Sequence, residues 1–269
     1  MRRSALPGLK LALGTTLFYL GLIICLPIAT LLTKAAGIGL DGYLHLVASP
    51  RVLAALRLTV LCALGATAFN AVFGLAMAWA LVRYDFPGRR LLDALVDLPF
   101  ALPTAVAGIA LTALFAKNGW FGAPLAAVGV PVAYTPLGIT LAMAFTSIPF
   151  VIRTVQPVLE ELDFEVEEAA QSLGANDLQI WRRVILPVIL PAFLAGSALA
   201  FARSLGEFGA IVFIAGNQPF RTEIVSLLTF IRLEEFDYPA AAALAVTMLL
   251  ASLALLLVVN GAQIGRAHV

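Results

Sequence analysis

Two charged side chains stand inside a long apolar stretch of the sequence. Arg203 and Glu207 are the only charged residues of the segment 188–215. An ionisable side chain in such a segment is costly to keep from water, so it is by default a candidate for contact with an ion or a polar substrate. A helix would place residues four apart on the same face. Two interpretations stay open: Arg203 attracts an anion while Glu207 restrains it or pairs with a neighbouring subunit, or the two side chains merely neutralise each other.

Arg57 and Arg153 are weaker candidates for contact with an anion. Arg57 lies near the start of the apolar segment 54–82, and Arg153 lies near the end of the segment 137–156. Arg57 either lines the mouth of a pathway or extends its charged end to water at the edge of the segment. For both arginines we favour a side chain that extends its charged end to water at the membrane interface.

Residue types that carry out catalysis are sparse in this chain. No phosphate-binding motif of the form G-x-x-x-x-G-K-[ST] occurs. The chain has three lysines, Lys10, Lys34 and Lys117, and none of them follows a glycine. His45 and His268 lack the spacing of metal ligands. Cys25 and Cys62 lie in apolar runs, where cysteine usually packs as a small apolar residue. We therefore expect no metal, no cofactor and no enzymatic activity in this chain.

The composition indicates what surrounds these residues. Of the 269 residues, 61% are hydrophobic and 12% are charged, whereas a soluble domain carries about 25% charged residues. Such a chain cannot cover a water-facing surface, so most of its exterior must face lipid. The net charge of +1 gives no sign of a nucleic-acid partner. The sequence therefore predicts an integral membrane protein.

Six apolar runs are long enough to cross a membrane. About 20 helical residues span the hydrocarbon core, which predicts an all-α membrane protein with six transmembrane helices: about 11–33, 54–82, 94–115, 137–156, 188–215 and 240–262. The third run contains Pro99 and Pro103, which indicate a helix kinked inside a bundle or beside a pathway. The fifth contains Gly196, Gly206 and Gly209, which permit close helix packing. A shorter amphipathic run at 221–237 predicts an interfacial or re-entrant helix.

The basic residues set the expected orientation. With the N-terminus in the cytoplasm, ten of the 17 basic residues fall in cytoplasmic segments and five fall in outer segments. This distribution agrees with the positive-inside rule. The first run is too long for the core of a secretory signal, so we interpret it as a retained span.

A polar stretch between residues 157 and 187 interrupts the apolar runs. Pro157 suits the first turn of a helix, and the acidic residues after it match a helix N-terminus. Gly174 can supply the left-handed residue that ends a helix, and Asn176 or Asp177 can cap a second one. We expect a short cytoplasmic helical hairpin. A small alanine face on its first helix would let another protein approach closely, as in a docking element.

This hairpin resembles the EAA loop of the permease subunits of ATP-binding cassette (ABC) importers. The matching pattern is Glu168-Ala169-Ala170, three residues, Gly174, nine residues, and Val184-Ile185-Leu186-Pro187. The family usually has isoleucine at the position of Val184. The resemblance implies a coupling helix that inserts into a groove of a cytoplasmic ATPase subunit, with these residues in the loop: Glu168, Ala169, Ala170, Gly174, Leu186 and Pro187.

The resemblance extends over nearly the whole chain and narrows the family. The stretches NAVFGLAMAWALVRYDFPGRR, PFVIRTVQPVLEELDFEVEEAAQSLGA and AFARSLGEFGAIVFIAGNQPFRTEI look like the T-type permease subunit of sulfate/thiosulfate importers. The core R-x-L-G-E-F-G, Arg203 to Gly209, is shared by sulfate and molybdate permeases. The resemblance implies a subunit of a sulfate/thiosulfate importer, and a molybdate or tungstate permease remains the alternative. The C-terminal IGRAHV has no match in the family.

The same resemblance implies the partners and the cellular location. It implies a second permease, a W-type homologue that forms a heterodimer with this chain. It also implies two ATPase subunits that hold ATP and Mg, and an extracytoplasmic sulfate/thiosulfate-binding protein. The expected location is a bacterial inner membrane, with both termini cytoplasmic. The expected fold is a type I ABC importer permease, divided into residues 1–53 (N-terminus, first span and first outer loop), the permease domain 54–262 with its coupling loop 157–187, and the C-terminus 263–269.

Two other classes of function fit the sequence less well. A membrane-embedded enzyme would need a nucleophile, base or metal ligands that converge within the spans, which offer almost none apart from Arg203 and Glu207. A passive channel has no use for a coupling hairpin.

Overall fold

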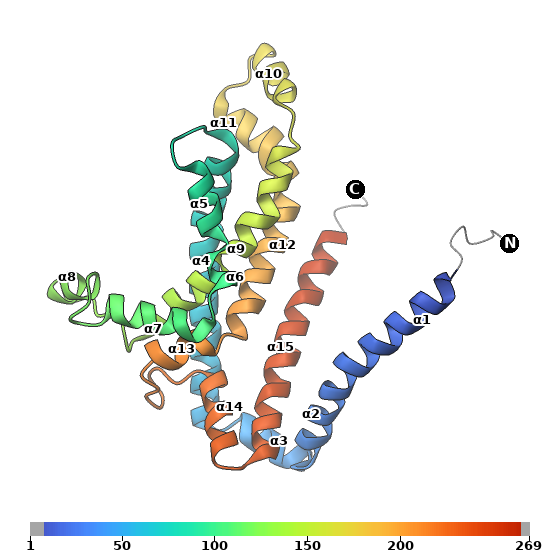
Figure 1. The fold of residues 1–269 in the computed structure, drawn as a ribbon, viewed down its shortest axis with the longest axis vertical. Coiled ribbons are helices and arrows are strands. Elements are labelled where there is room, and N and C mark those ends of the chain that lie inside the picture. Colours follow the sequence, from blue (N-terminus) through green and yellow to red (C-terminus); the bar gives the residue numbers. More distant parts are fainter. Residues whose placement is uncertain (1–7, 265–269) are drawn as a thin grey trace. The chain divides into compact units, whose positions relative to one another are not determined.

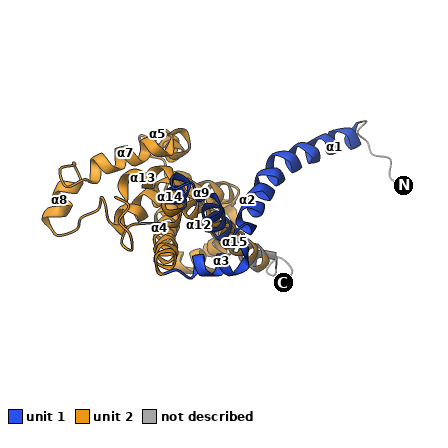
Figure 2. Cartoon of the chain, turned by 90° about the horizontal axis from the view of Figure 1, so that it is seen from below, with its two compact units in different colours: residues 1–49, 229–247 blue, residues 50–228, 248–269 orange. Residues whose placement is uncertain are grey.

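The computed structural model describes residues 8–264, and the regular elements of this range are all helices (Figure 1). The chain divides into two compact units, residues 1–49 with 229–247 and residues 50–228 with 248–269, which we describe separately (Figure 2). Four residues discussed above lie outside the described range: Arg2, Arg3, Arg266 and His268. Most of the stretch IGRAHV lies outside it too.

Three long helices form the centre of the second unit: α4 (Pro50–Arg83), α9 (Pro136–Glu160) and α12 (Leu186–Leu205). They lie against one another (Figure 1). Small residues at the contacts allow apolar helices to approach closely. At Gly196 of α12, an added Cβ atom would lie 2.0 Å from Thr154 Oγ1 and 2.9 Å from the carbonyl oxygen of Phe150 in α9. The expected close packing at Gly196 is therefore confirmed.

Four helical segments of the described range are long and apolar enough to cross a membrane: Leu9–Ala36, Pro50–Arg83, Pro136–Glu160 and Asp177–Leu205. Three of them contain runs expected from the sequence: 11–33, 54–82 and 137–156. Two further apolar helices are shorter within the described residues: Thr104–Phe115 and Tyr238–Ala254. The all-helical fold class agrees with the prediction.

The third expected run, 94–115, is broken into short helices and not merely kinked, and its crossing of the membrane stays a prediction. The chain instead forms α5 (Arg89–Val96), α6 (Leu98–Ala101) and α7 (Thr104–Phe115). Leu102 after α6 is extended, with a ψ of 134°. A residue before proline is disfavoured in the helical region, and Pro103 itself has no N–H to donate. From this break, α7 leads away from the long helices toward α8 (Gly122–Ala127) (Figure 1).

The fifth expected run, 188–215, also divides into two helices. Helix α12 ends at Leu205, and α13 (Gly209–Ile214) follows after a turn. Glu207 lies in this turn, so the prediction that it shares a helix with Arg203 is wrong. The Glu207 carboxylate instead accepts a hydrogen bond from the backbone N–H of Ala210, at 3.0 Å. It thereby satisfies one of the N–H groups that the first turn of a helix leaves free.

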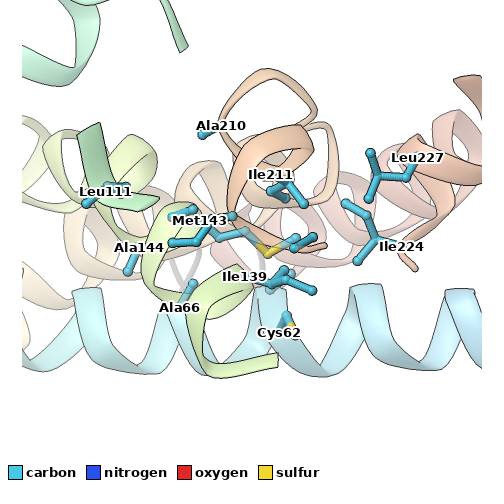
Figure 3. Packing of buried hydrophobic residues seen from close by; sticks show 14 of the residues in the cluster. Cys62, Ala66, Leu111, Ile139, Met143, Ala144, Ala210, Ile211, Ile224 and Leu227 are labelled. Carbon is cyan, nitrogen blue, oxygen red and sulfur yellow. The ribbon is translucent and has the colours of Figure 1, made fainter. Parts of the chain in front are cut away.

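The core of the second unit lies where α4, α7, α9 and α13 meet the beginning of α14 (Val225–Glu234) (Figure 3). Met143 and Ile139 of α9 pack there with Cys62 of α4 and Ile211 of α13. Cys62 is buried, as expected for a cysteine that packs as a small apolar residue, whereas Cys25 is exposed, contrary to that expectation.

The first unit contains shorter helical pieces. These are α1 (Leu9–Leu20), a π-helical stretch η1 (Gly21–Cys25), α2 (Leu26–Ala36), α3 (Gly39–Val47), the end of α14 and the start of α15 (Tyr238–Ile264). A small apolar cluster with Ala35 and Ala243 at its centre holds α2, α3 and α15 together. The hydroxyl groups of Tyr43 and Thr247 lie 2.8 Å apart. The expected short helix within 221–237 is present as α14.

Candidate functional site

The polar stretch forms the helical hairpin that the sequence predicts. Its first arm is α10 (Phe164–Ser172), and its second arm consists of α11 (Asp177–Ile180) and the π-helical stretch η2 (Trp181–Ile185), which continues into α12. One detail differs: Pro157 does not begin the hairpin but lies inside α9, which runs to Glu160. The short break at 161–163 then separates α9 from α10.

Two local signals shape the turn between the arms. Gly174 has a φ of 85°, in the left-handed region that glycine adopts most easily. Asn176 caps the second arm: its side chain accepts from the Gln179 N–H at 3.0 Å, and the Gln179 side chain accepts from the Asn176 N–H at 2.9 Å. This reciprocal pair is a capping box. The predicted turn at Gly174 and the predicted cap at Asn176 are both confirmed.

The hairpin presents a mixed surface at its tip. Glu168 and Ala169 are exposed, whereas Ala170 is half-buried and packs on the apolar cluster beneath the hairpin. Leu173 is 89% exposed, a feature that sequence reasoning missed. Leu186 packs on the same cluster at the start of α12, beside the exposed Pro187. The accessible surface of the tip is therefore not a plain alanine face but includes a protruding leucine.

A buried arginine connects the hairpin to α4. Arg83, the last residue of α4, donates to the Glu167 carboxylate of α10 at 2.5 Å, and its side chain is 6% exposed. Its guanidinium carbon lies 5.0 Å from the centre of the Trp79 ring and 4.6 Å from that of Phe164. The Trp79 ring in turn packs edge-on against Trp181, with the ring centres 4.9 Å apart. Sequence reasoning missed this cluster, because its members are about 80 to 100 positions apart.

Arg203 and Glu207 form an ion pair at the far end of α12. Arg203 Nη1 lies 2.7 Å from Glu207 Oε2, with side chains 31% and 1% exposed. The other carboxylate oxygen caps α13, as described above, and the Glu207 carbonyl accepts from the Ser226 hydroxyl at 2.9 Å. Glu207 therefore fixes α12, α13 and α14 to one another, while Arg203 remains partly accessible.

A second arginine at this end is held by another buried carboxylate. Arg51 makes two hydrogen bonds to Glu223, at 2.8 and 2.6 Å, and Glu223 is 1% exposed. Parallel contacts of this kind use the fork geometry of the guanidinium. Sequence reasoning missed this pair, which is 172 positions apart along the chain. Arg57 is exposed on the same helix, and the structure places it in no ion pair with the residues described.

Arg153 is held by two carboxylates, which the sequence did not indicate, and its position at the edge of the membrane stays a prediction. It bonds Asp97 through Nε and Nη2, at 2.8 and 2.6 Å, and Asp93 through Nη1, at 2.6 Å. These contacts fasten α5 and the start of α6 to α9. Within residues 8–264, no three His, Cys, Asp or Glu side chains are placed to hold a metal ion.

Comparison with known proteins gives the family. Residues 70–263 match the family described as the binding-protein-dependent transport system inner membrane component. The sulfate transport system permease protein CysT of Salmonella typhimurium is 58% identical over 97% of this chain and 94% of that protein. Its namesake from Escherichia coli is 56% identical over the same shares. The Synechocystis protein of this name is 48% identical over 91% of this chain and 86% of its own length.

Two solved structures share the fold. One is a bacterial ABC transporter involved in the import of the acidic polysaccharide alginate, with a TM-score of 0.78 and 17% identity over 95% of this chain and 94% of that chain. The other is a bacterial alginate ABC transporter in complex with its alginate pentasaccharide-bound periplasmic protein, with a TM-score of 0.76 and 18% identity over 94% and 92%. The two structures show the fold alone; the family match over residues 70–263 and the identity with the CysT proteins establish that the chain belongs to the binding-protein-dependent transport system inner membrane components.

Proposed function

We propose that this chain is a transmembrane permease subunit of an ATP-driven importer of sulfate and thiosulfate, in which it forms half of the translocation pathway. The observation that carries this proposal is the 58% identity with a sulfate transport system permease protein over 97% of the chain. In our proposal the chain crosses the inner membrane six times, with α5 to α7 and α15 as the third and sixth crossings, and both termini are cytoplasmic. The permease domain occupies 54–262, between the N-terminal region 1–53 and the short tail 263–269.

The hairpin of α10 and α11 is the proposed contact with the ATPase. Glu168 and Ala169 are exposed at its tip beside Leu173, and exposed apolar groups rimmed by polar ones are typical of protein interaction sites. Gly174 sets the turn, and Leu186 and Pro187 connect the hairpin to α12. ATP and Mg²⁺ belong to the ATPase in this scheme, and this chain contributes no catalytic residue.

Arg203 is the proposed contact with the anion, and Glu207 is the residue that positions it. Arg203 keeps 31% of its side chain exposed even while it is paired. Glu207 is buried and already engaged by the α13 backbone, which favours a positioning role over direct contact with a dianion that it would repel. The exposed Arg57 is a secondary candidate at the mouth of the pathway.

The proposed partners complete the transporter. A second permease, a W-type homologue in a heterodimer, supplies the other half of the pathway, and two ATPase subunits dock on the two hairpins. An extracytoplasmic binding protein captures sulfate or thiosulfate and delivers it. Because the binding protein captures the anion, the permease itself needs only a low-affinity route, which agrees with an Arg203 charge largely offset by Glu207 at 2.7 Å.

Uptake of labelled sulfate tests the proposal. Cells that lack the chain are compared with cells in which it is restored, each with and without an excess of thiosulfate or molybdate. We expect the restored uptake to be blocked by thiosulfate and barely affected by molybdate. Strong competition by molybdate would assign the chain to molybdate or tungstate import, and uptake that continues without ATP would indicate a passive channel.

A further inference from the structure

We propose that Arg83 is a positioning residue that makes the coupling hairpin move together with α4 as well as with α12. This inference rests on the proposed function, because it concerns how movement of the hairpin reaches the membrane helices. It assigns a role to a contact between side chains about 80 positions apart in the sequence.

The connections of α10 to the rest of the chain explain why such a contact is needed. On one side, residues 161–163 are not helical, and on the other side the chain turns at Gly174 with a φ of 85°. The second arm is different, because α11, η2 and α12 form a continuous helical path. The backbone alone therefore connects the second arm to α12 and leaves α10 with a break at each end.

Arg83 replaces the missing connection for α10. Its guanidinium lies over the ring of Trp79, on its own helix, and over the ring of Phe164, the first residue of α10, and it donates to Glu167 one turn further on. A planar guanidinium group can contact both rings and donate to the carboxylate at the same time, whereas the compact ammonium group of lysine cannot reproduce this arrangement. Both the start and the middle of α10 are thus tied to the last turn of α4.

The same turn of α4 also contacts the second arm. Trp79 and Arg83 are four residues apart and share one face of α4, and Trp79 packs against Trp181 at the start of η2. One face of α4 therefore contacts both arms of the hairpin. A displacement of the tip reaches α12 through the backbone and reaches α4 through these side chains.

The burial of Arg83 fits a positioning role better than a purely stabilising one. Its side chain is 6% exposed, and its Nε has no hydrogen-bond partner among the described residues. A buried donor without a partner is unfavourable, and replacing a buried ion pair by apolar residues is often neutral or stabilising. The buried guanidinium of Arg83 is therefore energetically unfavourable, yet it lies where it can define the orientation of α10.

The test uses the complete transporter in proteoliposomes, with sulfate uptake and ATP hydrolysis measured on the same preparation. Arg83→Lys keeps the charge and loses the stacking, and Glu167→Gln keeps the stacking and weakens the ion pair. We expect uptake per ATP hydrolysed to fall about fivefold in Arg83→Lys, and less in Glu167→Gln, while ATP hydrolysis continues. The matched control is Arg90→Lys, at an exposed arginine of α5, which should leave the ratio unchanged.

A distance measurement separates positioning from a general loss of stability. Spin labels at Tyr84→Cys and Ser172→Cys, in full-length chain with Cys25 and Cys62 replaced by serine, report on the end of α4 and the end of α10. We expect a narrow distance distribution with Arg83 and a broad one with Arg83→Lys, in lipid nanodiscs and without any partner. A narrow distribution in Arg83→Lys would overturn the inference, even if this variant does not assemble with the ATPase.

The two proposals fail in different ways. If the transporter with the unaltered chain takes up sulfate without consuming ATP, the proposed function fails. If it couples uptake to ATP and Arg83→Lys couples equally well, the function stands and the role of Arg83 is refuted.

Discussion

The two ends of the long helices differ in which partner of each ion pair is buried. At the hairpin end, Arg83 is less exposed than Glu167, 6% against 18%, and Arg153 is less exposed than both of its aspartates. At the opposite end the order is reversed: Glu207 and Glu223 are each 1% exposed, while their arginines are 31% and 34% exposed. Among the described ion pairs of the second unit, the carboxylate is therefore the more exposed partner at the hairpin end and the guanidinium group is the more exposed partner at the other end.

This reversal separates two tasks that a charged residue can perform. At the hairpin end only Arg83 is enclosed, whereas Arg153 is about as exposed as Arg203, and both arginines connect helices through their carboxylate partners. At the other end the carboxylates are enclosed, and they hold arginines that remain accessible to a solute. A guanidinium group that is fixed and accessible can donate hydrogen bonds to an anion even where a neighbouring carboxylate offsets most of its charge.

The largest effect should follow from removing the accessible arginine of α12. We expect Arg203→Ala to abolish sulfate uptake, because the proposed contact with the anion is lost, while the chain still assembles with its ATPase. Uptake and co-purification of the ATPase, measured on the same cells, check this. If assembly is lost together with uptake, Arg203 belongs with the positioning arginines and the contrast between the two ends fails.

The next largest effect is expected at the hairpin tip. A bulky residue at Ala169, or Gly174→Pro, should lower uptake at least about tenfold, because the first obstructs docking and the second cannot adopt a φ of 85°. Uptake relative to ATP hydrolysis is the measurement. The matched control for Ala169→Trp is Ala94→Trp, at an exposed alanine of α5 outside the hairpin. Full uptake in the hairpin variants would argue against the docking role.

A smaller effect tests the buried carboxylates. Arg51→Ala leaves Glu223 charged and nearly unexposed, so we expect a loss of about 1–2 kcal/mol in the free energy of unfolding, reduced from the value for a fully buried pair because Arg51 is 34% exposed. Glu223→Gln removes the charge and should cost less. Thermal unfolding in detergent measures both, with Arg57→Ala as the unpaired control. Equal losses in Arg51→Ala and Glu223→Gln would show that burial of the charge is not the cause.

The smallest effect is expected at Arg153, whose partners are more exposed than those of Arg51, Arg83 and Arg203. Exposed ion pairs contribute little singly, and Arg153→Gln should cost about 1 kcal/mol for the group of contacts to Asp93 and Asp97. Thermal unfolding and uptake should therefore both change only slightly. A collapse of uptake would indicate that the position of α5 against α9 matters for transport, and the hairpin end would then contain a second positioning arginine of equal weight to Arg83.

The hairpin could be predicted from sequence because its signals are local. A left-handed glycine and a capping residue lie within a few positions of the turn that they shape, and both Gly174 and Asn176 have the expected roles. The apolar runs that became α4 and α9 were likewise evident, since length and composition suffice to identify them.

The breaks and the ion pairs depend on neighbours that a run of residues does not reveal. Pro103 indicated an irregular helix, but whether the chain kinks or breaks depends on what satisfies the freed backbone groups around it. The end of α12 depends on the Glu207 carboxylate, which accepts a hydrogen bond from the Ala210 N–H in α13 and does not lie within α12. The partners of Arg51, Arg83 and Arg153 come from 56 to 172 positions away, and no local pattern specifies them.

The contact at Gly196 constrains how this protein can evolve. A methyl group there would meet not only the Thr154 hydroxyl but also backbone atoms of Phe150 and Val151, at 2.9 and 3.0 Å. A smaller residue at 154 would remove only the contact with the Thr154 hydroxyl, because substitutions leave the backbone atoms of Phe150 and Val151 in place. No single compensating substitution on α9 therefore makes alanine acceptable at 196, and the spacing of α9 and α12 is inherited as a fixed dimension of the fold.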